Sequence, residues 1–292
     1  MSVSDWFSTF CSNLVVANGS SISYRYKRIT GRLNTDFWDT DSDTAHSIYV
    51  GSYGRDTAIN GTSDFDMAVW LPWSLYTQYS RHQGNGQSAF LQAVRDSIKK
   101  TYTYTDVGAD GQVLVLSFDD GMTFEVLPCF ENDDGSFTHA DSNGGGSWKT
   151  TSPRAEIDAI NTRNTYTANG NLRRLCRMMR AWKRYCDVPI PGILIDTLAY
   201  QFIATYEYRE KSYLYYDYMS RDFFDYMAEQ DRTQDFWRAP GSGRYVYRDG
   251  RFEAKARRAC NIAKDAIAYE RNQQHYSAKS KWREIYGSSF PT

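Results

Sequence analysis

Apolar residues recur at helical spacing near the start of the chain. Residues 1–18 and 21–37 each carry one apolar stripe, which predicts two amphipathic helices. A third stripe predicts another helix over 88–104. The stripe residues are Trp6, Phe7, Phe10, Cys11, Leu14 and Val15, then Ile22, Tyr26, Ile29 and Leu33, then Phe90, Leu91, Val94 and Ile98.

Alternation of apolar and polar positions predicts strands between these helices. Residues 46–50 form one such segment. A clearer pair is 112–118 and 122–130, because the connecting Asp119-Asp120-Gly121 contains the Asp-Gly signal of a hairpin turn. In the second strand, Phe124 and its alternating neighbours would face one way and Glu125 the other. Glu125 is a candidate functional residue, because an unpaired acid is costly to bury.

The stretch 131–149 is acidic and glycine-rich and shows no periodicity. An irregular segment of this length in a compact protein is usually functional or disordered. We therefore predict a mobile flap here, with Trp148 and Lys149 at its far end.

From Pro153 onward the pattern is helical, and Pro153 suits a first helical position. The predicted helices span 171–185, 192–208, 252–270 and 277–285, with a loop at 239–243. Several tyrosines between 200 and 218 could stack on a base, but tyrosines in such a region more often pack between helices. The sequence gives no reason to select one of them as a base-stacking residue.

The helix predicted over 171–185 has two kinds of face. Its apolar side carries Leu172, Leu175, Cys176, Met179 and Trp182. Arg173, Arg177, Arg180 and Arg184 follow one another on another face, which we expect to be solvated, as rows of charge usually are. Lys183 instead continues the apolar stripe. Such a lysine either meets an anion or packs its stem while its ammonium group reaches water.

Candidate chemistry concentrates between residues 51 and 66. Gly51-Ser52-Tyr53-Gly54 is a glycine-rich turn of the kind that presents backbone N–H groups to an anion. Asp64 and Asp66 follow in an apolar segment, at positions that share one face of a strand. Two neighbouring carboxylates repel each other unless a cation lies between them. The order of turn, acidic pair and later acid is suited to binding a nucleoside triphosphate with a metal.

The composition of the chain disfavours several classes of protein. The 292 residues carry a net charge of −1 and a pI near 6.4, which disfavours a general nucleic-acid binder. Five scattered cysteines without a Cys-x-x-Cys pair fit reduced thiols better than disulfides, and no zinc cluster is readable. No signal peptide or membrane-spanning stretch is evident, so we expect a cytoplasmic protein that does not enter membranes.

These motifs resemble the polymerase-beta-like nucleotidyltransferase superfamily, and in particular the bacterial cGAS/DncV-like nucleotidyltransferases (CD-NTases). The resemblance rests on Gly51-Ser52, Asp64-Phe65-Asp66 and the acid at 125, and extends to 175–185, 192–203 and the end of the chain. It implies an α+β fold with a nucleotidyltransferase lobe containing a mixed sheet, over 1–149, and a helical lobe over 150–292. Relatives usually carry aspartate at 125 and a serine near Gly192, so this chain departs from them at both places.

The resemblance also implies roles. Asp64, Asp66 and Glu125 would hold two Mg²⁺ ions, or Mn²⁺, and Gly51, Ser52 and Lys183 would bind the triphosphate. The expected activity is condensation of ribonucleoside triphosphates into a cyclic di- or trinucleotide second messenger by a monomer. That signal would activate a separate effector in antiphage (CBASS) defence. Two alternatives remain: transfer of a nucleotide to RNA or protein, and a non-catalytic nucleotide sensor.

Overall fold

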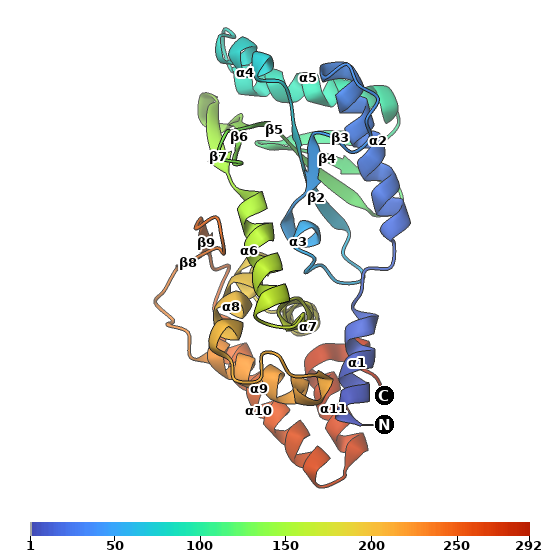
Figure 1. The fold of residues 1–292 in the computed structure, drawn as a ribbon, viewed down its shortest axis with the longest axis vertical. Helices are drawn as coiled ribbons and strands as arrows, with labels where there is room; N and C mark the ends of the chain where they lie inside the picture. The colour runs from blue at the N-terminus through green and yellow to red at the C-terminus, as the bar shows by residue number, and fades with distance from the viewer. Residues whose placement is uncertain (1) are drawn as a thin grey trace. The chain divides into compact units, whose positions relative to one another are not determined.

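The computed structural model describes residues 2–292, which form two compact units. The sheet unit contains 17–55 and 61–157. The helical unit contains the residues up to 16, the short segment 56–60, and 158–292. The boundary expected from sequence, between 149 and 150, falls within a strand of the sheet unit, whereas the first helix belongs to the helical unit (Figure 1).

Within the described residues, the sheet unit contains a seven-stranded mixed sheet of order β1-β2-β5-β4-β3, with β6 pairing with β5 and β7 (Figure 1). Its central pair, β2 and β5, is parallel, and the other pairs are antiparallel. The predicted strand at 46–50 and the predicted hairpin are therefore confirmed. The strands are β1 (Ser47–Tyr49), β2 (Asp64–Trp70), β3 (Asp106–Asp110), β4 (Val113–Ser117), β5 (Thr123–Glu131), β6 (Phe137–Asp141) and β7 (Ser147–Thr151).

Helices α2 (Gly19–Phe37) and α5 (Gly86–Thr101) pack against each other and against the sheet. Both follow the predicted stripes, whose residues Ile22, Ile29, Leu33, Phe90, Val94 and Ile98 are fully buried. The alternate residues Phe65, Met67, Phe124 and Val126 of β2 and β5 are also buried. The sequence pattern did not predict α4 (Trp73–Ser80) or β3.

The predicted mobile flap at 131–149 is wrong. Strands β6 and β7 form an antiparallel pair there, and Asn132 accepts a hydrogen bond from Gly135 N–H at 2.9 Å in the turn that precedes it. The Trp148 ring packs within 5.0–5.8 Å of the rings of Tyr76, Phe90 and Phe130, measured between ring centres. Lys149 forms an ion pair with Asp141. Aromatic packing therefore fixes a segment whose own composition looked irregular.

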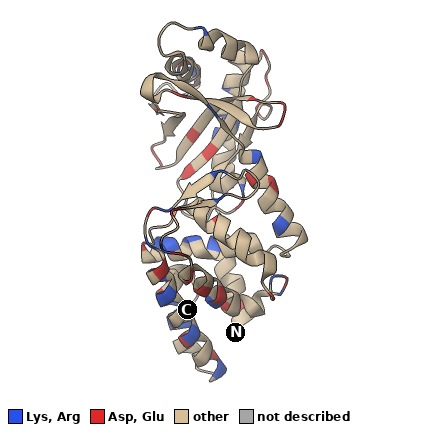
Figure 2. Ribbon diagram, turned by 90° about the vertical axis from the view of Figure 1, so that its left-hand side faces the viewer, with Lys and Arg blue, Asp and Glu red and all other residues tan. Residues whose placement is uncertain are grey.

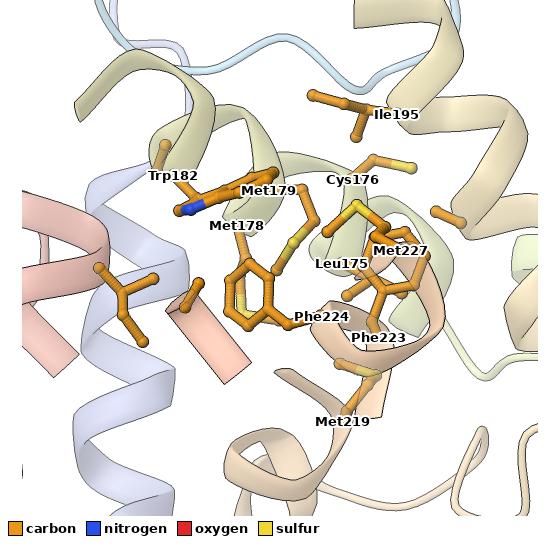
Figure 3. Packing of buried hydrophobic residues seen from close by; sticks show 14 of the residues in the cluster. Leu175, Cys176, Met178, Met179, Trp182, Ile195, Met219, Phe223, Phe224 and Met227 are labelled. Atoms are coloured by element: carbon orange, nitrogen blue, oxygen red, sulfur yellow. The ribbon is translucent and has the colours of Figure 1, made fainter. Parts of the chain in front are cut away.

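The helical unit surrounds a single large apolar cluster. Figure 3 shows α7 side chains, among them Met178, Met179 and Trp182, packed with Phe224 of α9. The helices are α1 (Val3–Asn13), α7 (Asn171–Cys186), α8 (Gly192–Thr205), α9 (Tyr216–Ala228), α10 (Glu253–Arg271) and α11 (His275–Tyr286), with turns η2 (Tyr213–Tyr215) and η3 (Gly287–Ser289). Helix α6 (Pro153–Tyr166) begins in the sheet unit and continues in the helical one. Over residues 2–292, no helix is both long and apolar enough to cross a membrane.

Three of the four arginines in the α7 row are largely covered, contrary to the prediction of a solvated face, and only Arg184 of the four is exposed. Arg173 and Arg177 form ion pairs with Asp56. Arg180 donates to Asp196 at 2.6 Å and to the Thr57 hydroxyl at 3.0 Å. Arg184 donates to the carbonyl of Asn60 at 2.7 Å. Together these arginines hold the segment 56–60, which connects the Gly-Ser turn to β2, so the row is structural.

The carboxyl group of Asp217, in the first turn of α9, should make the stability of the protein fall as the pH rises. Burial, reinforced by the charge of Glu270, raises the pKa of Asp217 from its usual 3.8 to about 6. The folded protein thus favours the neutral acid, and this contribution to stability is complete below pH 3.8 and is lost as the pH rises through 6. Asp217→Asn should therefore stabilise the protein by about 2–3 kcal/mol at pH 8 and by almost nothing at pH 4. Urea unfolding at both pH values measures this, and an equal gap at both would contradict it.

Candidate active site

The parallel pairing of β2 and β5 brings the predicted acids together. Asp66 and Glu125 are partners in register, so their backbones lie about 4.8 Å apart and their side chains leave the same face. Asp64 lies two positions before Asp66 on that face. Figure 2 shows acidic segments on neighbouring strands of the sheet. Asp64 is exposed, and Asp66 and Glu125 are half-buried.

The Gly-Ser turn lies against Asp66. Strand β1 runs antiparallel to β2, and Val50 N–H donates to the Asp66 carbonyl at 2.9 Å. The chain then enters the one-turn helix α3 (Gly51–Gly54), whose Gly51 has a φ of +59°. A Cβ at Gly51 would lie 1.8 Å from Asp66 Oδ2 and 2.6 Å from Asp66 Cγ. Glycine is required here both by the backbone conformation and by the adjacent carboxylate.

Burial and neighbouring negative charges disfavour the ionised forms of Asp66 and Glu125. Burial raises the pKa of Asp66, the Asp64 charge raises it further, and the Arg55 guanidinium opposes the rise. Burial also raises the pKa of Glu125, with additional contributions from the charges of Asp66 and Asp64. A bound cation would relieve this repulsion and favour the ionised acids.

Arg55 and Glu156 are site residues to which the sequence pattern assigned no role. Arg55 N–H donates to the Gly51 carbonyl at 3.2 Å, which closes the turn. The Arg55 guanidinium is buried and forms an ion pair with Glu156 of α6, with Nη1 3.1 Å from Oε2. A buried pair of this kind restricts the backbone next to Gly51. The only signal in the sequence is an arginine directly after the glycine-rich turn.

The donor set suits a hard cation, because it consists of carboxylate oxygens. The backbone positions of Asp64, Asp66 and Glu125 fit a shared site. Ser63 donates its hydroxyl proton to Asp64 Oδ1 at 3.1 Å, which holds that carboxylate at the beginning of β2. As the side chains stand between residues 2 and 292, no group of three or more acidic, histidine or cysteine side chains is positioned to hold a metal. Joint ligation by these acids therefore requires side-chain rotation.

Two other predicted residues lie outside the acidic face, Ser52 in the adjoining Gly-Ser turn and Lys183 in the helical unit. Ser52 is half-buried on α3, directly after Gly51. Lys183 is half-buried on α7 in the helical unit. Their contact with a triphosphate stays a prediction.

The packing around Gly192 explains why this position carries no serine side chain. A Cβ at this position would lie 2.4 Å from Arg180 Nη1. Because Arg180 is occupied by Thr57 and Asp196, a side chain at 192 would displace an arginine that anchors the segment 56–60.

More than half of the chain matches a known protein family. Residues 1–164 match the model of the Second Messenger Oligonucleotide or Dinucleotide Synthetase domain, SMODS. This chain belongs to the SMODS family. It is accordingly an enzyme of the nucleotidyltransferase class, as its motifs predicted. No curated protein sequence matches this SMODS chain significantly.

Solved structures confirm the predicted α+β, polymerase-beta-like fold of this SMODS protein. The CdnC:HORMA-deltaN complex of E. coli MS115-1 aligns with a TM-score of 0.69 and 15% identity, over 99% of this chain and 98% of that one. A mutant of the Vibrio cholerae di-nucleotide cyclase DncV aligns with a TM-score of 0.67 and 14% identity, over 84% of this chain and 70% of that one. The Bradyrhizobium diazoefficiens CD-NTase CdnG, in complex with GTP, aligns with a TM-score of 0.63 and 11% identity, over 97% of this chain and 94% of that one.

Proposed function

We propose that this SMODS protein condenses ribonucleoside triphosphates into a cyclic di- or trinucleotide second messenger and releases pyrophosphate. The observation that carries the proposal is the shared face of Asp64, Asp66 and Glu125 beside the Gly51 turn. Acids in this arrangement are what metal-assisted phosphoryl transfer requires, because that chemistry depends on positioning and on neutralising charge. The proposed setting is CBASS signalling in the cytoplasm, by a monomer whose product activates a separate effector.

The proposed reaction assigns a task to each residue. Asp64, Asp66 and Glu125 would hold two magnesium ions, with manganese as a substitute, and these ions would neutralise the charge that develops on the attacking and leaving oxygens. Gly51 permits a close approach of the donor triphosphate to the backbone, while the Ser52 hydroxyl and the Lys183 ammonium group bind phosphate oxygens. The ribose hydroxyl of the acceptor attacks the α-phosphorus, and the bond to pyrophosphate breaks. Glu125 accepts the hydroxyl proton.

Glu125 is one methylene longer than the aspartate usual in relatives. Its backbone position opposite Asp66 is fixed by the register of β5, so the additional length extends its carboxylate further from the sheet. This gives the carboxylate the reach to rotate toward the acidic pair.

An experiment on the reaction product distinguishes the alternatives. The protein is incubated with all four α-labelled ribonucleoside triphosphates and Mg²⁺ or Mn²⁺, in the presence and absence of cell lysate. The mixture is treated with phosphatase and separated by chromatography. We expect a small phosphatase-resistant product, whose ring mass spectrometry can identify. Labelled RNA or protein would instead show transfer to a macromolecule, and triphosphate binding without pyrophosphate release would indicate a sensor.

A further inference from the structure

Strands β8 (Phe236–Arg238) and β9 (Tyr245–Tyr247) form an antiparallel hairpin in the helical unit (Figure 1). Its two faces differ in the exposure of their side chains. On the inner face, Trp237 and Val246 are 4% and 3% exposed and join the apolar cluster. On the outer face, Phe236, Tyr245 and Tyr247 are 41%, 47% and 60% exposed. The inner face anchors the hairpin, so the outer aromatic rings stand on a fixed support.

The outer side chains are already ordered with respect to one another. Phe236 pairs with Tyr247 across the strands, and Arg238 pairs with Tyr245. The ring centres of Phe236 and Tyr245 are 4.6 Å apart, edge to face. The Arg238 guanidinium lies 4.2 Å from the Tyr245 ring centre, and its Nη2 donates to the Tyr245 hydroxyl at 2.9 Å. Little rotamer freedom is therefore left to lose when a ligand binds.

The charge of this region differs from that of the whole chain. Residues 231–253 include five arginines, three aspartates and one glutamate, a local excess of one positive charge in a chain whose net charge is −1. Arg248 is committed to an ion pair with the buried Glu253. Arg232, Arg238 and Arg251 are exposed. These exposed arginines supply positive charge for phosphate groups in the segment that forms and flanks the hairpin.

We propose that the outer face of the β8–β9 hairpin binds single-stranded nucleic acid, independently of the proposed catalytic function. Every base has a π-face that can stack on an aromatic ring or an arginine plane, and arginines attract the phosphates. A double helix would offer phosphates but keeps its bases stacked within the duplex. An acidic peptide would satisfy the arginines but would leave the faces of Phe236 and Tyr247 without a flat partner.

Fluorescence anisotropy of a labelled twelve-nucleotide oligo(U) tests the proposal with the full chain. We expect measurable binding at low salt, with the Kd of a Phe236→Ala, Tyr247→Ala double variant increased about tenfold or more. Arg238→Gln should weaken binding and reduce the dependence of binding on salt concentration. Tyr276→Ala is the matched control, because Tyr276 is 86% exposed on α11, outside the hairpin, and this variant should bind as the wild type does.

Three results would overturn the proposal: no binding at low salt, undiminished binding by the hairpin variants, or equal binding of a duplex of the same length. Circular dichroism establishes that each variant is folded. If the double variant is not folded, Tyr247→Ala alone carries the test, since its side chain is the most exposed of the hairpin rings.

Discussion

Gly51→Ala is expected to reduce nucleotidyl transfer by about 100-fold or more while leaving the protein folded. The new Cβ would lie 1.8 Å from Asp66 Oδ2 and 3.0 Å from Asp66 Cβ, so the carboxylate must move away from the turn. A displacement of this size at a catalytic group costs about that factor. The positive φ of +59° adds a stability cost of about 1 kcal/mol for alanine. Pyrophosphate release and thermal unfolding measure the two effects separately.

Gly135→Ala is the matched control for this substitution. Gly135 lies in the same unit and has a φ of +80°, but a Cβ there would meet no atom within 4 Å. The Gly135→Ala variant should therefore lose stability through backbone strain but keep the nucleotidyl-transfer activity of the wild type. Equal activity of the two variants would contradict the role assigned to the contact between Gly51 and Asp66.

Asp196→Ala should destabilise the protein by about 3–5 kcal/mol, because it leaves the Arg180 guanidinium buried without its counter-charge. Asp196 is fully buried and accepts hydrogen bonds from Arg180 at 2.6 Å and from the Thr57 hydroxyl at 2.9 Å. The loss also removes the shared acceptor of Arg180 and the Thr57 hydroxyl, while the ion pairs of Asp56 with Arg173 and Arg177 remain. Urea unfolding of the variant measures the change.

Two further variants test whether the loss of stability arises from the unpaired buried charge of Arg180. Replacing both partners, as in Arg180→Met with Asp196→Ala, should cost less than the sum of the single changes, because no isolated charge remains. Arg257→Ala removes an exposed arginine that pairs with Asp225 and Glu229, and should change stability little. A strictly additive double variant would contradict the proposed coupling between Arg180 and Asp196.

The acidic face was predictable because its signal is local. Alternation along a strand places Asp64 and Asp66 together, and the Asp120-Gly121 turn indicates the strand that carries Glu125. The register that sets Asp66 opposite Glu125 was not predictable. Strands β2 and β5 are distant in sequence, so no local turn sets their register.

Two incorrect predictions have the same physical origin. Asp134-Gly135 carries the same turn signal as Asp120-Gly121, but the strands after it are stabilised by rings from α4, α5 and β5 rather than by their own alternation. The arginines of α7 have the spacing of a solvated row, yet their partners lie at 56–60 and at Asp196. Spacing along one helix contains no information about such distant partners.

The shared acidic site is tested most directly by pyrophosphate release from ribonucleoside triphosphates, measured for the wild type and for Asp66→Asn with and without Mg²⁺. Asp110→Asn is the control, because Asp110 is exposed on β3 and contributes only to the charge around Glu125. We predict metal-dependent release by the wild type and by Asp110→Asn, and a loss of about a thousandfold in Asp66→Asn. Unchanged release by a folded Asp66→Asn protein would contradict the assignment of this face as the active site.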